Sequence, residues 1–548
     1  MLDGNKWQTR LSPEMSSRYA ASGKWPGLTL AGAAAAQVRD RPNKIVVVDG
    51  ASRLSFAEIS GRAARLTKAL QDMGLQAGDV VSFQLPNWHE AMIVNLAASM
   101  GGFVSNPIVP IYRDAELAFI LKDAGTKALF LPGGTFRGVD YCGMISRLRD
   151  GLPELAHLVC VRSDVAGATA FDELVGEDRP DDYRPAGDAD DVKLLLYTSG
   201  TTGKPKGVLH SHNTLRAEID AVVEYWRVSE ADAVLMASPV THITGYLYAL
   251  ELPFVCGGTA ILMSQWDCAE AIRLVNAYGG TLSVGATPFL AELTAEIERS
   301  GQEVPSLRLF ACGGAPVPPE LIVRAAVVMP SCIACRVYGS SETPTVSLGV
   351  DTLGQVDRAA TTDGFIYNHE VKIVDPVDGS PVGPGCEGEI LTRGPEVMLG
   401  YTDPAETDAA FDGEGYFRTG DLGVVDADGF ITISGRKKDL IIRGGENISP
   451  KEIEDVLHEH PAIDEVAVVA MPHPRMGETP AAYVVPAAGA SFGFDDMIAY
   501  LDQRRLAKQK FPEKLIVVDE LPRNAAGKVQ KNILRERMME ASRDKLNR

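Results

Sequence analysis

An apolar run that opens directly into a small polar loop constrains this chain more than any other feature. The stretch LLLYTSGTTGKPKGVLH, residues 194–210, passes from three leucines into threonine, serine, glycine, lysine and proline before apolar residues return. Such a loop cannot fill a core, because its polar groups would lose their hydration without compensation. The pattern therefore predicts a buried strand, a loop that holds something polar, and a helix over residues 213–226.

The composition of this loop suits a phosphate group. Glycines let backbone N–H groups converge, hydroxyls donate hydrogen bonds and lysines supply positive charge. The candidate phosphate-binding residues are Thr198, Ser199, Gly200, Thr201, Thr202, Gly203, Lys204 and Lys206. A Walker loop is excluded by spacing, since it needs four residues between its glycines and Ser or Thr after its lysine. The alternative, a plain surface turn, rarely combines so many hydroxyls, glycines and lysines.

The length and order of the elements predict an α/β protein of more than one domain. The chain has 548 residues, more than a single core usually serves. Strand-like runs alternate with helical patterns, which is typical of strands covered by helices. We expect a large N-terminal domain of stacked α/β subdomains over residues 1–434, a hinge at 435–439 and a small mobile α+β domain over 440–548.

Charge and hydropathy exclude several classes of partner. The net charge of -20 argues against nucleic acid, because such partners favour a basic surface. Apolar runs stay shorter than the ~18 to 20 residues of a membrane span. The N-terminal stretch lacks a basic region leading into an apolar one, so no secretory signal is predicted and a cytoplasmic location is expected. The i,i+2 pairs His210/His212 and His458/His460 are not expected to bind metal, because that spacing points side chains apart on a helix.

Three segments in chain order resemble motifs of the adenylate-forming superfamily, which includes acyl-CoA synthetases, nonribosomal adenylation domains and luciferases. YTSGTTGKPKGV resembles its phosphate loop, ACGGAP (311–316) its adenine-side glycine turn and VYGSSET (337–343) its Tyr-Gly-x-x-Glu segment. The resemblance implies a nucleotide-binding role for these residues: Gly313, Gly314, Ala315, Tyr338, Gly339 and Ser341. It also implies that Glu342 holds Mg²⁺.

The resemblance continues to the C-terminus. Asp421, in GYFRTGDLG, is similar to the family's ribose-binding aspartate, and Arg436 to an arginine that contacts ribose and phosphate. Lys528, in PRNAAGKVQK, is similar to the lysine that reaches the active site for adenylation. Lys438 stands at the family's hinge position. Gly444 and Gly445, in IIRGGEN, resemble the segment that faces the pantetheine tunnel after rotation.

These resemblances imply a two-step reaction that consumes ATP and coenzyme A (CoA). The carboxylate of a small acid attacks the α-phosphorus of ATP, which forms an acyl-AMP and releases pyrophosphate. The thiol of CoA then attacks the activated carbonyl, and AMP leaves. Positioning and charge neutralisation supply most of the catalysis in such a phosphoryl step.

The segment at residues 238–253 resembles the part of the family that shapes the acyl pocket, with His242 as the gate residue. Thr241, Gly245, Tyr246 and residues 284–289 are expected to complete its walls. None of these wall positions is acidic or basic, so the acid is expected to be apolar apart from its carboxylate.

The segments SFQLPNWHE and VSNPIVPIYRDAELAFIL resemble the corresponding segments of ligases for cyclohexanecarboxylate, medium-chain fatty acids and aryl acids. Ile243 stands where hydroxybenzoate enzymes commonly carry asparagine. An alicyclic or short- to medium-chain aliphatic acid is therefore favoured.

Three other functions remain open at this point. A stand-alone adenylating enzyme would load the pantetheine of a carrier protein instead of free CoA. A luciferase-type enzyme would oxidise its adenylate, which nothing in the sequence favours. A nucleotide sensor would be expected to lack Lys528 or Glu342, and the chain has both.

Overall fold

The computed structural model describes residues 6–198, 205–315, 317–444, 446–523 and 529–546. The chain forms two compact units. The larger unit comprises Met1–Glu370 and Arg393–Phe417, and the smaller comprises Val371–Thr392 and Arg418–Arg548. The chain thus crosses between the units near residues 370, 393 and 417. The predicted hinge at 435–439 lies within the smaller unit and stays a prediction.

The first sheet of the larger unit has seven strands, parallel except at the edge where β2 runs antiparallel to β1. In spatial order they are β16 (Ile333–Arg336), β15 (Leu309–Cys312), β14 (Leu282–Gly285), β12 (Ala233–Met236), β13 (Thr259–Leu262), β1 (Ile45–Asp49) and β2 (Ser52–Ser55).

The second sheet of the larger unit has eight strands, and its edge at β10, β11 and β19 is antiparallel. In spatial order they are β19 (Gly400–Tyr401), β11 (Lys206–Ser211), β10 (Val192–Thr198), β4 (Val104–Pro107), β3 (Val80–Phe83), β5 (Thr126–Pro132), β8 (His157–Val161) and β9 (Thr169–Ala170). A separate hairpin pairs β6 (Thr135–Phe136) with β7 (Val139–Asp140).

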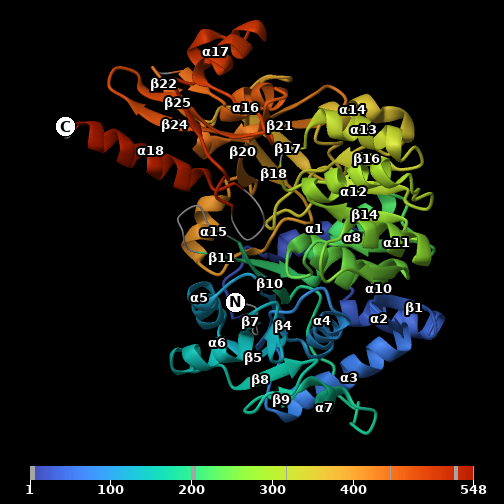
Figure 1. Ribbon diagram of the computed structural model, residues 1–548. Helices are drawn as coiled ribbons and strands as arrows, with labels where there is room; N and C mark the ends of the chain where they lie inside the picture. Colours follow the sequence, from blue (N-terminus) through green and yellow to red (C-terminus); the bar gives the residue numbers. More distant parts are fainter. Residues whose placement is uncertain (1–5, 199–204, 316, 445, 524–528, 547–548) are drawn as a thin grey trace. The chain divides into compact units, whose positions relative to one another are not determined.

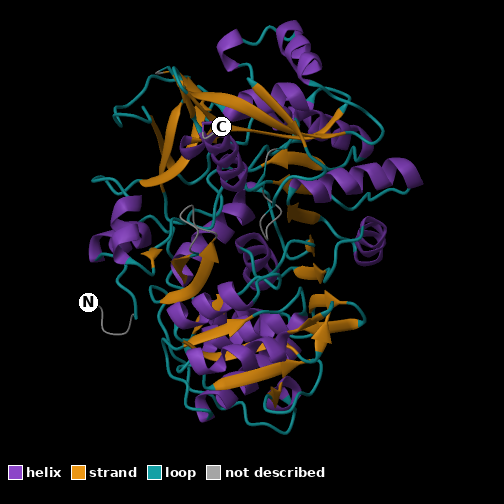
Figure 2. Ribbon diagram, turned by 60° about the vertical axis from the view of Figure 1, so that its left-hand side comes forward, coloured by secondary structure: helices purple, strands orange, loops and turns teal. Residues whose placement is uncertain are grey.

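Helices connect and cover these strands (Figures 1 and 2). Every residue of α4 (His89–Gly101) is buried, including the polar residues His89, Glu90, Asn95 and Ser99. It contacts β1 of one sheet and β3 and β4 of the other, so it lies between the two sheets. The other helices of this unit are α1 (Pro13–Ala21), α2 (Leu30–Asp40), α3 (Phe56–Asp72), α5 (Asp114–Ala124), α6 (Tyr141–Leu148), α7 (Phe171–Val175), α8 (His212–Tyr225), α9 (Ile243–Gly245), α10 (Leu252–Cys256), α11 (Cys268–Tyr278), α12 (Thr287–Ser300), α13 (Pro319–Val328), α14 (Val356–Thr361) and α15 (Pro404–Ala410). A π-helix, η2 (Tyr246–Glu251), joins α9 to α10.

Within its described residues, the smaller unit contains two further sheets and three α-helices. One sheet has the order β17 (Glu370–Val374), β18 (Gly388–Arg393), β20 (Phe417–Val425) and β21 (Ile431–Arg436). The other has the order β23 (Glu446–Ile448), β22 (Ile441–Arg443), β25 (Gly477–Pro486) and β24 (Ile463–His473), with β26 (Lys514–Val517) beside β25. The helices are α16 (Pro450–His458), α17 (Phe494–Gln503) and α18 (Lys531–Leu546).

Side-chain alternation along β24 gives the smaller unit a core on each face of this sheet. Val466 and Val468 pack in one cluster with residues of α16 and α17. Ala467 and Val469, which point the other way, pack in a second cluster with residues of α18. Figure 1 shows α16 and α18 beside the β24–β25 pair. The predicted α/β class, with a large N-terminal domain and a smaller α+β C-terminal domain, is confirmed.

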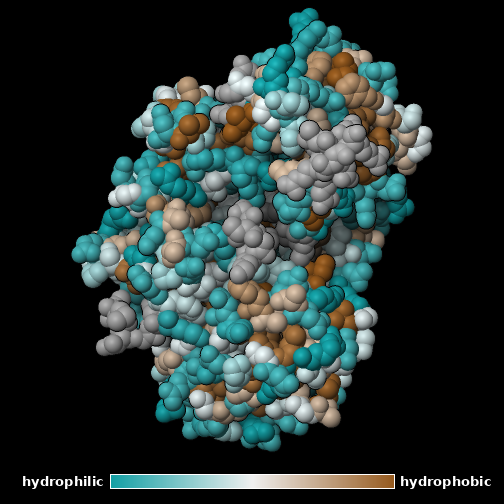
Figure 3. Space-filling view, turned by 90° about the vertical axis from the view of Figure 1, so that its left-hand side faces the viewer, coloured by the Kyte–Doolittle hydropathy of each residue, from teal (hydrophilic) through white to brown (hydrophobic). Residues whose placement is uncertain are grey.

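Hydrophilic residues predominate on the face shown in Figure 3, and apolar side chains appear there only in small groups. Across the parts of the chain that the structure describes, no helix combines the length and apolar character needed to cross a membrane.

Candidate functional site

Four of the predicted motifs leave the same edge of the seven-stranded sheet. The gate segment (residues 238–253) follows β12, residues 284–289 run from the end of β14, the glycine turn follows β15, and the Tyr338–Glu342 segment follows β16. These strands are neighbours and parallel, in the order β16, β15, β14, β12. Their carboxyl ends therefore lie together, which is where ligands bind in open α/β sheets.

The strands on either side of the phosphate loop form a tight antiparallel pair. Thr198, the last residue of β10, lies opposite Lys206, the first residue of β11. Six of the seven residues of β10 are buried, which anchors the hairpin in the interior. The predicted phosphate-binding residues Ser199, Gly200, Thr201, Thr202, Gly203 and Lys204 lie outside the described residues, but this pairing brings the two ends of their loop together.

Tyr401, which the sequence analysis did not single out, joins the predicted magnesium ligand Glu342 to the predicted phosphate-binding residue Lys206. Its hydroxyl donates to Oε1 of Glu342 at 2.9 Å. The ammonium of Lys206 lies over its ring, 5.2 Å from the centroid, and pairs with Glu406. Burial and the adjacent Glu342 carboxylate raise the pKa of Tyr401, so its hydroxyl stays a donor. A cation and a carboxylate therefore flank one tyrosine at the end of the phosphate-loop hairpin.

The backbone around Glu342 is held by hydrogen bonds from distant residues. Nε2 of His210 bonds the carbonyl oxygen of Ser341 at 2.8 Å, and the Met398 N–H donates to the carbonyl of Glu342 at 2.8 Å. The Arg10 guanidinium in turn donates to the carbonyls of Met398 and Val397. A carbonyl only accepts, so Nε2 carries the proton of the His210 ring. Complete burial lowers the pKa of His210 to about 4, which keeps the ring neutral.

Close backbone approaches explain why glycine stands in both nucleotide motifs. A side-chain carbon on Gly339 would lie 1.9 Å from the carbonyl oxygen of Pro344, and one on Gly313 would lie 2.6 Å from that of Val337. Gly314 has a φ of 82°, a left-handed conformation that glycine adopts without strain. Ala315 completes the described part of the turn. Space therefore favours glycine at positions 313 and 339, and backbone conformation favours it at position 314.

The gate segment is anchored at its start. Asn87, at the end of the sequence QLPN, accepts from the N–H of Val240 at 2.8 Å and donates to the carbonyl of Ser238 at 2.9 Å. His242 is half-buried and caps α9, with Nδ1 accepting from the N–H of Thr244 at 3.5 Å. Gly245 is pressed against the carbonyl of Pro239, where a side-chain carbon would lie at 2.2 Å.

Two charged groups near the predicted acyl wall escaped the sequence analysis. Glu251, within the gate segment, forms a buried ion pair with Lys193 of β10. Glu218, on α8, is buried and accepts hydrogen bonds from Tyr248 and Thr345. No local pattern identifies either one, because their partners lie far away in the sequence.

Residues predicted to bind ribose are paired in the smaller unit. Asp421 and Arg436 lie opposite each other in the β20–β21 pair, with 3.0 Å between Arg436 Nε and Asp421 Oδ1. Lys438 lies just beyond β21 in a short 3₁₀ turn, and burial lowers its pKa. Gly444 has a φ of 61°, whereas Gly445 and Lys528 lie outside the described residues.

Charge compensation argues against a metal site at the one three-ligand cluster within the described chain. Asp49, His89 and Glu90 place potential ligand atoms within 4.8 Å of one another. The Arg162 guanidinium bonds both carboxylates, with 2.7 Å from its Nε to Glu90. The arginine thus supplies the positive charge that a cation would otherwise bring.

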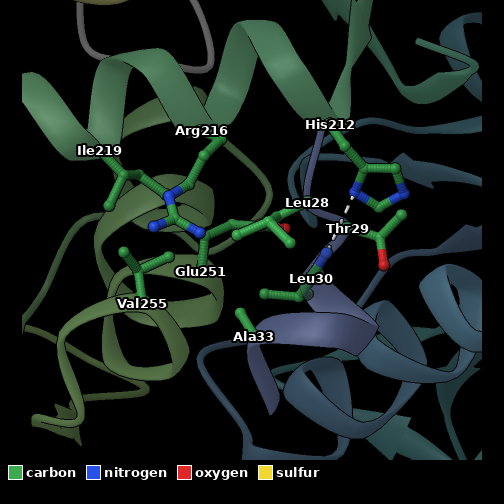
Figure 4. A pocket seen from close by; sticks show the side chains of 9 residues that line it. All are labelled: Leu28, Thr29, Leu30, Ala33, His212, Arg216, Ile219, Glu251 and Val255. Atoms are coloured by element: carbon green, nitrogen blue, oxygen red, sulfur yellow. Dashed lines mark hydrogen bonds between the residues drawn. The ribbon is translucent and has the colours of Figure 1, made fainter. Parts of the chain in front are cut away.

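Figure 4 shows a further pocket, which meets the gate segment at Glu251. Its lining residues come from the segment before α2, from α2 itself, and from α8, η2 and α10: Leu28, Thr29, Leu30, Ala33, His212, Arg216, Ile219, Glu251 and Val255. The dashed bond in the figure runs from the N–H of Leu30 to Nδ1 of His212, 3.3 Å long. None of the predicted site residues lines it, so it is not the predicted catalytic centre.

Comparisons with known proteins agree with this arrangement. Residues 34–402 match the AMP-binding enzyme family, and residues 452–528 match the AMP-binding enzyme C-terminal domain. A medium-chain fatty-acid–CoA ligase of Escherichia coli (strain K12) is 35% identical over 95% of this chain and 92% of its own. A feruloyl-CoA synthase of Amycolatopsis sp is 32% identical over 95% and 99%. ATP-bound MatB from Rhodopseudomonas palustris superposes with a TM-score of 0.82 at 31% identity, over 93% of this chain and 99% of its own.

The chain therefore belongs to the AMP-binding enzyme family. It is an AMP-forming carboxylic acid–CoA ligase, with ATP, CoA and a small carboxylic acid as its substrates. The resemblance drawn from the sequence motifs is confirmed.

Replacing Gly339 by alanine should weaken ATP binding. The added carbon would clash with the Pro344 carbonyl, so the turn that carries Glu342 must shift. We expect the KM for ATP to rise about tenfold or more, which corresponds to ~1.4 kcal/mol. Gly354→Ala is the matched control, since nothing lies within 4 Å of its added carbon. An unchanged KM for ATP in Gly339→Ala would contradict the predicted nucleotide-binding role of the Tyr338–Glu342 segment.

The buried His210 should make the protein less stable as the pH falls. Its pKa is about 4 in the folded state against 6.5 as the reference value, so the unfolded state binds the proton more tightly. The free energy of unfolding should therefore fall between about pH 6.5 and 4, by up to ~3 kcal/mol. His210→Gln cannot titrate there, and denaturant unfolding of both proteins across this range measures the difference. If the free energy of unfolding had the same pH dependence in the wild type and in His210→Gln, the prediction that the buried His210 ring is neutral would be refuted.

Proposed function

We propose that this ligase activates an alicyclic or a short- to medium-chain aliphatic acid and transfers the acyl group to free CoA. The observation that carries the proposal is the common edge of β16, β15, β14 and β12. That edge places the segments assigned to the acyl group directly beside those assigned to the nucleotide. A carboxylate bound at the segments after β12 and β14 would lie next to an α-phosphate bound at the segments after β15 and β16.

In the first step, an oxygen of the substrate carboxylate attacks the α-phosphorus of ATP and pyrophosphate leaves. The donors of residues 198–206 bind the phosphates, and Lys528 neutralises charge that grows on the α-phosphoryl group. Tyr401 and Lys206 hold one side of this region, because the tyrosine hydroxyl orients Glu342 and the ammonium lies over the ring.

Glu342 fits the predicted magnesium site. A carboxylate is the hard oxygen ligand that Mg²⁺ prefers, and hydrogen bonds at Glu342 hold both its side chain and its backbone in place. Bound there, the ion would neutralise charge on the phosphates of ATP.

In the second step, the thiol of CoA loses its proton and its sulfur attacks the acyl carbon, and AMP leaves. We assign Asp421 and Arg436 to the ribose of the nucleotide, since a carboxylate accepts from both ribose hydroxyls. Lys438 is proposed as the hinge, and Gly444 and Gly445 as the wall of the pantetheine tunnel. The acyl-AMP must be kept from water between the two steps.

Three observations favour an apolar acid. The medium-chain fatty-acid–CoA ligase is 35% identical over most of the chain, against 32% for the feruloyl-CoA synthase. Thr241, Gly245 and Tyr246 are buried, and the hydroxyl of Tyr246 is already bonded to Asn95 at 2.6 Å. The charge of Glu251 is compensated within the protein by Lys193.

The substrate class is tested by ATP- and CoA-dependent AMP release against a panel of acids. The panel contains cyclohexanecarboxylate, butanoate to decanoate, benzoate, hydroxybenzoates and a steroid side-chain acid. We expect AMP and acyl-CoA in equal amounts with alicyclic or aliphatic acids. A preference for the aromatic acids would overturn the substrate class. Pyrophosphate exchange without thioester from free CoA would indicate loading of a carrier protein.

Replacing Lys528 by alanine should separate the two steps. If Lys528 neutralises charge on the α-phosphoryl group, Lys528→Ala should lower the adenylation rate at least about a hundredfold. Thioester formation from added acyl-AMP should change little. Lys508→Ala, at an exposed lysine of the same unit, serves as the control. Equal loss of both steps would refute a role confined to adenylation.

A further inference from the structure

The π-helix η2 of the gate segment is tied to its surroundings by buried polar side chains. Tyr246 donates to Asn95 of α4 at 2.6 Å, and Glu251 pairs with Lys193 of β10. Tyr248 donates to Oε1 of Glu218 on α8 at 2.9 Å. π-helical turns are rare and occur frequently at functional sites. Each of these three bonds joins the gate segment to a different element.

Of these partners, Glu218 connects the gate segment to the segment that carries Glu342. The same Oε1 atom that accepts from Tyr248 also accepts from the hydroxyl of Thr345, three residues after Glu342. The hydroxyls of Tyr248 and Thr345 are themselves 3.2 Å apart. A single carboxyl oxygen therefore joins the helix after the phosphate loop, the gate helix and the segment that carries Glu342.

The surroundings of Glu218 suit a structural anchor. Glu218 is 1% exposed, and the indole of Trp226 packs 5.9 Å from the Tyr248 ring between centroids. Burial raises the pKa of Glu218 to about 7. A buried carboxyl is costly unless hydrogen bonds satisfy it, and its removal leaves its former donors without an acceptor. Truncating this side chain would therefore release both Tyr248 and Thr345 from their common position.

We propose that Glu218 is a positioning residue for adenylation, which holds the gate helix and the Glu342 segment in register through its bonds to Tyr248 and Thr345. It acts through these two residues and not by contact with the reacting atoms. The proposal rests on the proposed role of Glu342 as the magnesium ligand, and not on the identity of the acid.

The test measures ATP binding as a function of Mg²⁺ by calorimetry, which needs no acid substrate. Glu218→Leu removes the acceptor, whereas Glu218→Gln keeps an oxygen that accepts from both hydroxyls. In Glu218→Leu we expect the Mg²⁺ concentration for half-maximal ATP affinity to rise about tenfold, and in Glu218→Gln to stay within about threefold. Pyrophosphate exchange with the best acid of the panel should show the matching rise in KM for the acid in Glu218→Leu.

Asp232→Asn serves as the control, because it alters a buried carboxyl that lies away from the predicted motifs. Asp232 precedes β12 and accepts from Ser229, Thr281 and Arg308, on the edge of the sheet opposite the motifs. This variant should lose thermal stability without a change in Mg²⁺ dependence. Glu218→Leu with lowered stability but wild-type Mg²⁺ dependence and KM would overturn the proposal.

Two further variants keep the test decisive if Glu218→Leu does not fold. Tyr248→Phe and Thr345→Val each remove one hydrogen bond and leave the carboxyl in place. Each should raise the Mg²⁺ concentration for half-maximal ATP affinity, as Glu218→Leu does, but by a smaller factor. The double variant should show a smaller effect than the two single effects added together. Wild-type behaviour of both would overturn the proposal. A wild-type protein that binds ATP with Mg²⁺ but exchanges pyrophosphate with no acid of the panel would count against the proposed substrate class alone.

Discussion

The parallel arrangement of β12, β14, β15 and β16 is the constraint on which the candidate site depends. Parallel strands deliver all their following segments to one edge of the sheet, and here those segments are the predicted acyl gate, its predicted wall, the glycine turn and the Tyr338–Glu342 segment. An antiparallel pair at this point would send neighbouring motifs to opposite edges. The proposed adjacency of the acid and the nucleotide thus follows from strand direction.

A layer of buried, mostly neutral hydrogen bonds holds these segments in place. His210 fixes the carbonyl before Glu342, Met398 fixes the carbonyl of Glu342 itself, and Tyr401 fixes its carboxylate. A neutral imidazole avoids the cost of a buried charge while it supplies a directed N–H. Two ionisable groups that are both buried, Lys193 and Glu251, pair with each other. Removing one partner of such a pair would leave an uncompensated charge in the interior.

Several elements followed from local sequence pattern, and others did not. Apolar residues before the polar loop predict β10 directly, and the glycines at 313 and 339 are explained by backbone contacts that only glycine permits. The return strand β11 was not predicted, because the sequence LHSHN joins a strand to a helix without a turn residue between them. The division of the chain between its two units also differs from the predicted division at residue 434. Residues 371–392 join the smaller unit by strand pairing with β20, a contact between distant parts of the chain.

The sequence by itself determined the class of chemistry, because the groups predicted to bind phosphate are contiguous. Glycines, hydroxyls and lysines gathered within residues 198–206 predict a phosphate loop without reference to the rest of the chain. Only the tertiary structure decided which residues support that chemistry. Tyr401 is 59 residues from Glu342, His210 is 131 from Ser341, and Glu218 is 127 from Thr345. No local periodicity records such pairs, since a hydrogen bond depends on where folding brings two side chains and not on their separation along the chain.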